Sequence, residues 1–235
     1  MIDKLSNSPL DLVEFKIWWH IYNHEELKNI SSLIGKFFRQ TVDEFPIMNE
    51  PESDNNPFEL VFESYNKFSK EGSEFPYIKL GKKQFSYCSH KENYVWDEFS
   101  KDALHKTNLL FEILEELIQP DHFHLELNYS NFIRNTKNIH LTDYLSKNLN
   151  FNMTGPILSD NPNAIKLDLG FKKEYGKRVV QIKSEKKGLH LNLFSKSNKV
   201  DPDIETIKSW ITEVHSDLST LFKDMTKGIL YESFN

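Results

Sequence analysis

The chain has 235 residues, a formal net charge of −6, 13% aromatic residues and a single cysteine, Cys88. The aromatic content excludes a disordered chain, and one cysteine excludes an intramolecular disulfide scaffold. No run of about 18 apolar residues predicts a transmembrane helix, and the start of the chain has no apolar signal-peptide core. We therefore expect a cytoplasmic protein without a membrane partner. The negative charge disfavours nucleic acid as a partner.

Apolar residues at alternating or helical spacing predict the elements of the first half of the chain. The alternation of Val13, Phe15, Ile17 and Trp19 is typical of a strand. In order, we expect a strand, a helix, three strands and a long helix, over residues 10–21, 25–39, 58–62, 77–80, 84–89 and 94–118.

The second half has the same predicted order of elements. The last helix is expected to begin at Asp201-Pro202, because aspartate caps free N–H groups and proline at the first helical position has no N–H to lose. In order, we expect a strand, a short helix, three strands and a final helix, over residues 123–129, 141–149, 165–171, 180–182, 189–193 and 201–225.

The two predicted hairpins also match in sequence. Residues 78–87 and 182–191 share a pattern of apolar residues and lysines at a constant offset (182 − 78 = 104). Any two hairpins can look alike by chance, but we favour a duplication. We expect an α+β protein of two similar β-α-β-β-β-α halves, residues 8–120 and 121–235, with mainly antiparallel sheets and helices packed on one side.

Short motifs along the chain resemble those of one family of prokaryotic proteins of about 250 residues. Residues 7–17 (NSPLDLVEFKI) are similar to the family's N-P-L-x-E-V-x-F start. Residues 77–81 and 94–99 resemble its I-Q-L-G and Y-x-x-W-x-x-F segments, and residues 207–222 resemble its closing W-L-x-x-x-H helix. Asn128 stands where the family carries an arginine in mid-chain.

That family is sporadically distributed among prokaryotes and has no assigned activity or catalytic residues. The resemblance therefore implies no site residue for this chain. A patchy distribution implies an accessory gene, of the kind found in antiviral defence islands or toxin–antitoxin pairs.

Several histidines are candidates for chemistry. His122, His124 and Glu126 alternate with apolar residues and share one face of a strand, and His190 occupies the non-core face of a later strand. Two histidines with Glu126 or Asp168 can form a metal site for a hydrolase or nuclease. A solvated polar face explains the same pattern, so we expect no metal and no other cofactor.

Two further features have a functional and a structural interpretation. His215 in the last helix has a side chain that can act as an acid or base near neutrality, or can hydrogen-bond a neighbouring strand. Lysines cluster in turns, but the chain has only three arginines, Arg39, Arg134 and Arg178, so a nucleic-acid surface is disfavoured.

The adjacent Trp18 and Trp19 point to opposite faces of the first strand, so only one of them can lie in the core. The other is covered within the chain or anchors a partner.

We expect a non-enzymatic recognition protein whose partner protein is encoded nearby. The alternatives are the metal-dependent enzyme on the His122/His124/Glu126 face and a small-molecule or nucleotide sensor that binds between the halves. The sequence does not indicate an oligomeric state.

Overall fold

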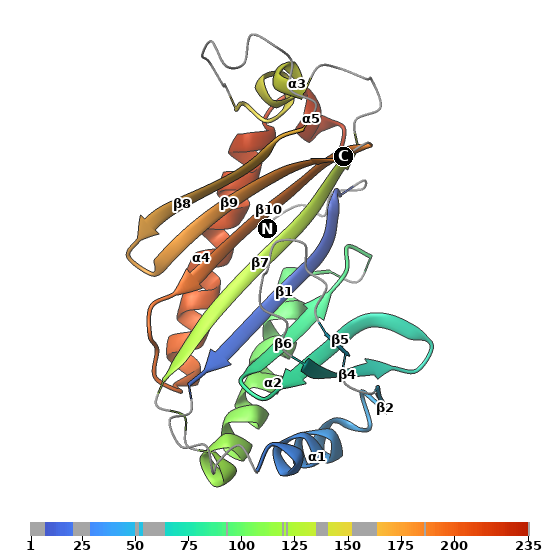
Figure 1. Ribbon diagram of the computed structural model, residues 1–235, viewed down its shortest axis with the longest axis vertical. Helices are drawn as coiled ribbons and strands as arrows, with labels where there is room; N and C mark the ends of the chain where they lie inside the picture. Colours follow the sequence, from blue (N-terminus) through green and yellow to red (C-terminus); the bar gives the residue numbers. More distant parts are fainter. Residues whose placement is uncertain are drawn as a thin grey trace.

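The fold is α+β, with one large sheet and helices against it, in a computed structural model (Figure 1). The residues that the structure describes are 8–20, 29–49, 52–53, 64–92, 94–118, 120, 122–134, 141–151, 164–185 and 187–234. The strands are β1 (Leu10–Trp19), β2 (Ile47–Met48), β3 (Glu52–Ser53), β4 (Ser64–Lys70), β5 (Ser73–Gly81), β6 (Gln84–Ser89), β7 (Phe123–Arg134), β8 (Lys166–Lys173), β9 (Gly176–Glu185) and β10 (Gly188–Ser197).

The sheet runs in the order β2-β4-β5-β6-β1-β7-β10-β9-β8, and β3 also pairs with β4. All neighbouring strands in the described part of the chain are antiparallel. β1 and β7 meet in the middle, in a register that places Phe15 opposite Leu127. From this central pair, β6, β5 and β4 follow on one side, and β10, β9 and β8 follow on the other.

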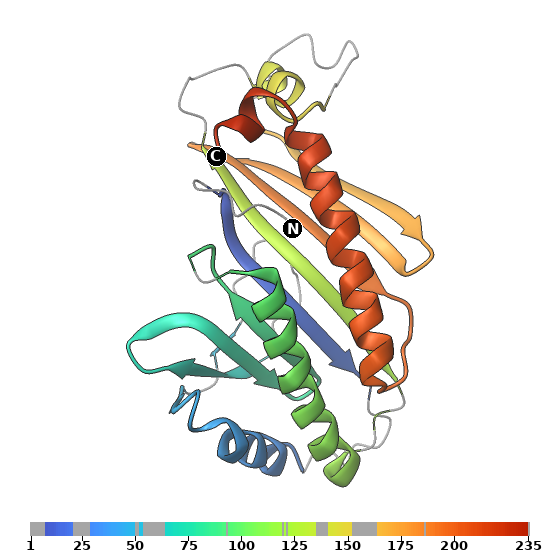
Figure 2. The same ribbon diagram turned by 180° about the vertical axis from the view of Figure 1, so that it is seen from behind.

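The helices are α1 (Ile30–Thr41), α2 (Trp96–Leu117), α3 (Leu141–Asn148), α4 (Ile204–Thr226) and α5 (Ile229–Glu232). The two long helices, α2 and α4, lie across the same side of the sheet (Figure 2). We call this side the helix face and the opposite side the far face. None of the described helices is long and apolar enough to cross a membrane.

The helix face holds the apolar core because alternate residues of each strand point to it. Val13, Phe15 and Ile17 of β1 are fully buried there, next to Leu125 and Leu127 of β7. The inner sides of both long helices pack on these residues, including Leu110 of α2 and Ile211 of α4.

Most predicted elements are present, with shifted bounds. β7 extends to Arg134, five residues beyond the predicted end of the strand at residue 129 (134 − 129 = 5). The last helix begins later than predicted. Its cap is Asp203, whose carboxylate accepts a hydrogen bond from the Thr206 backbone N–H, so the prediction of Asp201 as the cap is wrong.

The strand predicted over residues 58–62 lies outside the described residues. The structure instead has β4 over Ser64–Lys70, which we did not predict. Phe68 is fully buried, but its neighbours Lys67 and Ser69 are polar, so the segment lacks the clear apolar alternation that identifies a strand.

Candidate functional site

A cavity lies on the helix face, where α2 begins and α4 approaches its end. It is a cavity of about 180 Å³ between the two long helices, and residues of β1, β7 and β10 form its floor. Most of its lining is apolar or aromatic. Its polar groups include those of Tyr94, Tyr129, Asn131, His215 and Ser219.

One wall of the cavity is a stacked pair of rings from the two long helices. Trp96, the first residue of α2, lies flat on His215 of α4, with ring centroids 3.7 Å apart and planes only 7° from parallel. His215 is on the buried side of α4, one helical turn after Ile211. The stack therefore joins α2 to α4 and holds the imidazole plane in one orientation.

A short hydrogen-bond chain leads from this imidazole to the strand below. The Tyr129 hydroxyl of β7 lies 2.6 Å from His215 Nδ1, and the Tyr94 hydroxyl lies 2.9 Å from that of Tyr129. Ser219 Oγ is also near Nδ1, at 3.4 Å. The sequence prediction that His215 hydrogen-bonds a neighbouring strand agrees with this geometry.

Burial keeps the whole chain of groups neutral. It lowers the pKa of His215 from 6.5 to about 4 and raises the pKa of Tyr129 well above its usual value of 10. At neutral pH the Tyr129 hydroxyl and Nδ1 of the uncharged imidazole therefore share one hydrogen bond, and the Tyr94 and Tyr129 hydroxyls share another. None of the described residues hydrogen-bonds Nε2 of His215.

This arrangement favours binding over nucleophilic catalysis. Nδ1 is already hydrogen-bonded to the Tyr129 hydroxyl at 2.6 Å, so it is not free to act as a base for Ser219, which lies farther away at 3.4 Å. Two exposed lysines, Lys91 and Lys223, stand at the edge of the cavity. The site thus combines an uncharged interior with positive charge at its entrance, which suits a largely apolar ligand with an anionic group.

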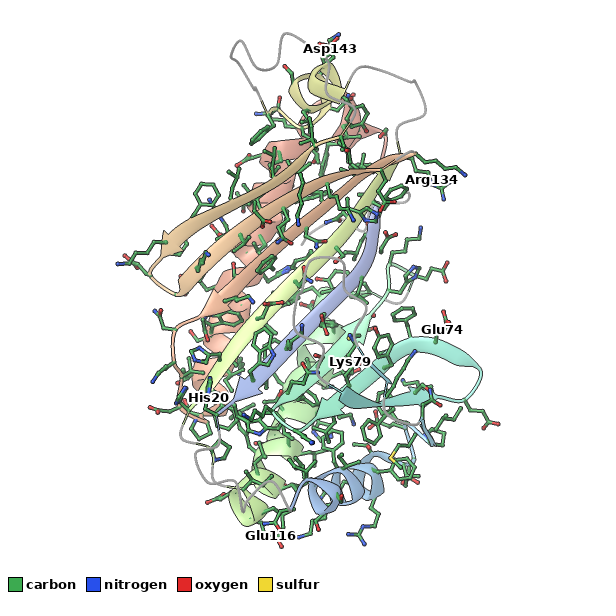
Figure 3. All side chains as sticks on the ribbon, viewed as in Figure 1. His20, Glu74, Lys79, Glu116, Arg134 and Asp143 are labelled. Carbon is green, nitrogen blue, oxygen red and sulfur yellow. The ribbon has the colours of Figure 1, made fainter. Side chains whose placement is uncertain are left out.

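The far face carries a different set of polar residues, several of them buried. Glu14 is 3% exposed and lies 3.6 Å from Lys16 Nζ and 3.5 Å from Lys79 Nζ. Burial alone raises the pKa of Glu14, but the charges of the two lysines outweigh it and lower the pKa to about 2. Lys79 is labelled in Figure 3, where it rises from this face of the sheet.

The structure separates the two tryptophans as the alternation predicts. Trp19 points to the helix face and is 1% exposed. Trp18 is half-buried on the far face, with Lys16 Nζ 5.0 Å and Lys196 Nζ 4.9 Å from its ring centroid.

The predicted histidine face is only partly brought together. His122 and His124 do lie on the same side of β7, and His20 from the end of β1 joins them. Glu126 forms an ion pair with Lys196, at 3.0 Å. His190 lies opposite Phe132, near the other end of β7, and pairs with Glu185 at 3.2 Å, so it belongs to a different place on the sheet.

Asp168, a further candidate metal ligand, also lies far from His122 and His124 in the sheet. It lies on β8, three strands from β7, and accepts a hydrogen bond from Gln181.

Two of the basic residues near the β8–β9 turn form ion pairs within the fold. Lys173 and Arg178 both contact Asp217 of α4, at 3.2 Å and 3.0 Å, so these two charges do not add to a free basic surface.

Sequence reasoning found His215 but missed its partners. Tyr129 appeared only as an alternating strand residue, and Trp96 only as a helix residue. The alternation of aromatic and polar residues in Leu127–Asn131 gave no sign that Tyr129 faces a helix 86 positions away.

No protein-family model, curated protein or solved structure matches this chain. The function therefore has to be argued from the geometry of the sites.

Proposed function

We propose that the protein binds a small, single-ring organic acid in the cavity between α2 and α4, and so acts as a ligand-binding protein. One observation carries this proposal. The cavity has a neutral, aromatic interior, formed around the Trp96–His215 stack, and two lysines at its entrance.

The size of the cavity supports a ligand with one ring. A cavity of about 150 Å³ in another protein holds benzene, and the present one measures about 180 Å³. The ring would lie among Leu10, Leu193 and Phe222, and the acidic group would meet Lys91 and Lys223. Nε2 of His215 supplies a further hydrogen-bonding group for a polar substituent.

The test is a calorimetric titration of the full chain with three single-ring probes of similar size, namely the anion benzoate, the neutral benzamide and the cation benzylamine. We expect benzoate to bind tightest, because only it brings a negative charge to the lysines. The double change Lys91→Ala with Lys223→Ala should reduce benzoate binding to the level of benzamide. Lys101→Ala, an exposed lysine of α2 outside the cavity, is the matched control and should have no effect.

Two results would contradict the proposal. One is that none of the three probes binds. The other is that benzoate binds equally well after Trp96→Ala, because a ligand in the cavity must respond to the loss of the wall.

A second candidate is recognition of a protein partner through Trp18 on the far face. What supports it is a half-buried indole on a sheet surface, between two lysines. Aromatic residues of this kind anchor many interfaces. Co-purification with the product of a neighbouring gene, lost in Trp18→Ala but kept in Phe171→Ala, an exposed aromatic of β8, supports it. A complex that survives Trp18→Ala would rule out this anchor.

We also infer that residues 8–120 and 121–235 are two copies of one β-α-β-β-β-α unit. The support is that the strands follow outward from the centre as β1-β6-β5-β4 and as β7-β10-β9-β8. In both halves a long helix follows the third of the long outer strands, as α2 follows β6 and α4 follows β10. Co-expression of the two halves as separate chains should give a soluble complex. Failure to associate would contradict this division.

A further inference from the structure

We propose that His20, His122 and His124 form a binding site for one zinc ion on the far face of the sheet. This site is separate from the cavity and does not depend on the function proposed for it. It takes zinc through one nitrogen of each imidazole, with a fourth position left for water.

The pairing of the two central strands brings these residues together. Trp18 lies opposite His124, and Trp19 lies opposite Phe123. The next position places His20 beside His122, where the His20 backbone N–H donates to the His122 carbonyl at 3.4 Å. Figure 3 labels His20 at this end of the sheet, opposite the end marked by Arg134.

Alternation then puts all three imidazoles on one side. Trp19 and Phe123 are buried in the core on the helix face. Their neighbours in the two strands must therefore point to the far face. His122 and His124 are two residues apart on β7, and His20 stands across from them at the end of β1, so the three form a triangle.

The geometry of the triangle fits a metal. One nitrogen from each ring lies within 4.8 Å of the other two. Three nitrogens bound to tetrahedral zinc at about 2.0–2.1 Å are roughly 3.4 Å apart. The rings already sit close, with centroids 4.7 Å apart for His20 and His122 and 5.3 Å apart for His122 and His124. Small side-chain rotations bring the nitrogens to the required distance.

The type of ligand selects the metal. Imidazole nitrogen suits zinc and other late transition metals, whereas magnesium and calcium prefer oxygen ligands. Glu126 is the nearest acidic residue along this face of β7, but it is engaged by Lys196. The ligand set is therefore three histidines. This proposal departs from the sequence-based expectation of no metal, and its ligands differ from the alternative of two histidines with a carboxylate.

His20 is exposed and His122 and His124 are half-buried, so the metal would be reachable from solvent. Three protein ligands with one accessible position are the pattern of catalytic zinc sites, whereas structural sites are closed by four. The site therefore suits a zinc ion that carries a water molecule.

The test is isothermal titration of untagged, chelator-treated full-length protein with zinc chloride. We expect one zinc ion per chain, a visible absorption spectrum of tetrahedral type with cobalt, and no binding of magnesium. His20→Ala and His124→Ala should each weaken zinc binding at least about a hundredfold, since even residues behind a ligand cost about 10–100-fold. His105→Ala, an exposed histidine of α2, is the matched control and should bind as the unmodified chain does.

His20→Ala is the decisive variant because this side chain is exposed and its removal leaves the core unchanged. Its circular dichroism and thermal transition without metal should match those of the unmodified chain. Zinc should raise the transition temperature of the unmodified chain and of His105→Ala, but not that of His20→Ala. Absence of zinc binding, or zinc binding that survives both His20→Ala and His124→Ala, would overturn the proposal.

Discussion

The two faces of the sheet keep polar groups out of water in opposite ways. On the helix face, burial lowers the pKa of His215 to about 4, so the imidazole gives up its charge and hydrogen-bonds as a neutral group. On the far face, Glu14 keeps its charge, because Lys16 and Lys79 lower its pKa to about 2. A buried ionisable group can avoid the free-energy cost of desolvating a charge by becoming neutral, or can offset that cost by pairing with an opposite charge.

This difference suits the sites on each face. A neutral, mostly apolar cavity is appropriate for a ligand with an aromatic ring. A face that already holds paired charges and clustered imidazoles is appropriate for ions. Each prediction below changes one face and leaves the other intact.

The largest expected effect separates Trp19 from Trp18. Trp19→Ala removes a fully buried side chain from the helix face and should lower the free energy of unfolding by about 4 kcal/mol. Trp18→Ala removes a half-buried side chain from the far face and should cost clearly less. Urea unfolding of both variants measures the difference. Equal losses would mean that the far face is packed as a core.

The second prediction concerns the buried charges. Glu14→Gln removes the carboxylate that Lys16 and Lys79 both contact, and should lower the free energy of unfolding by about 3 kcal/mol. Glu115→Gln on the exposed side of α2 is the control. Because the pKa of Glu14 is lowered from 4.5 to about 2, its contribution is present above pH 4.5 and is lost as the pH falls towards 2. Glu14→Gln should not show that loss.

The third prediction is that His215 on the helix face makes the free energy of unfolding depend on pH in a higher pH range than Glu14 does. Because the pKa of His215 falls from 6.5 to about 4 on folding, the unfolded chain binds the extra proton first, and stability drops as the pH falls from 6.5 to 4. We expect a loss of about 3 kcal/mol over this range. His215→Phe should remove it and His105→Phe should not. A loss that persists in His215→Phe would assign it to another group.

The smallest effect comes from a single hydroxyl. Tyr129→Phe deletes the hydroxyl that hydrogen-bonds both His215 Nδ1 and the Tyr94 hydroxyl, and should lower the free energy of unfolding by about 1 kcal/mol. Tyr144→Phe is the control, because no described residue hydrogen-bonds that hydroxyl. The measurement is urea unfolding at pH 7. A larger effect in the control would show that the hydrogen-bond chain contributes little.

The strands and long helices could be predicted because their apolar residues repeat at clear intervals. Phe15 and Ile17 identify β1, and Leu110 and Ile113 identify α2. β4 could not be predicted, because the fully buried Phe68 stands between the polar residues Lys67 and Ser69 and gives almost no alternating pattern. The position of the helix cap at Asp203 depends on local backbone geometry, which composition alone does not determine.

The sites were harder to predict than the fold. His122 and His124 were identified because their spacing of two places them on one side of a strand. His20 was missed because it comes to lie beside His122 only when β1 pairs with β7. A local sequence pattern does not reveal which strands pair. The Trp96–His215 stack was missed for the same reason, since it depends on the crossing of two helices.

The central position of β1 has a consequence for biosynthesis. During translation, β1 can pair with β6 as soon as residues 84–89 have left the ribosome, but its other edge stays open until β7 (Phe123–Arg134) has also emerged. For that interval the nascent chain presents a ten-residue strand with unpaired backbone groups, and such an edge can recruit strands from other chains. The arrival of β7 closes it, so a slowdown of synthesis between these two strands would be the step at which the protein is most exposed to aggregation.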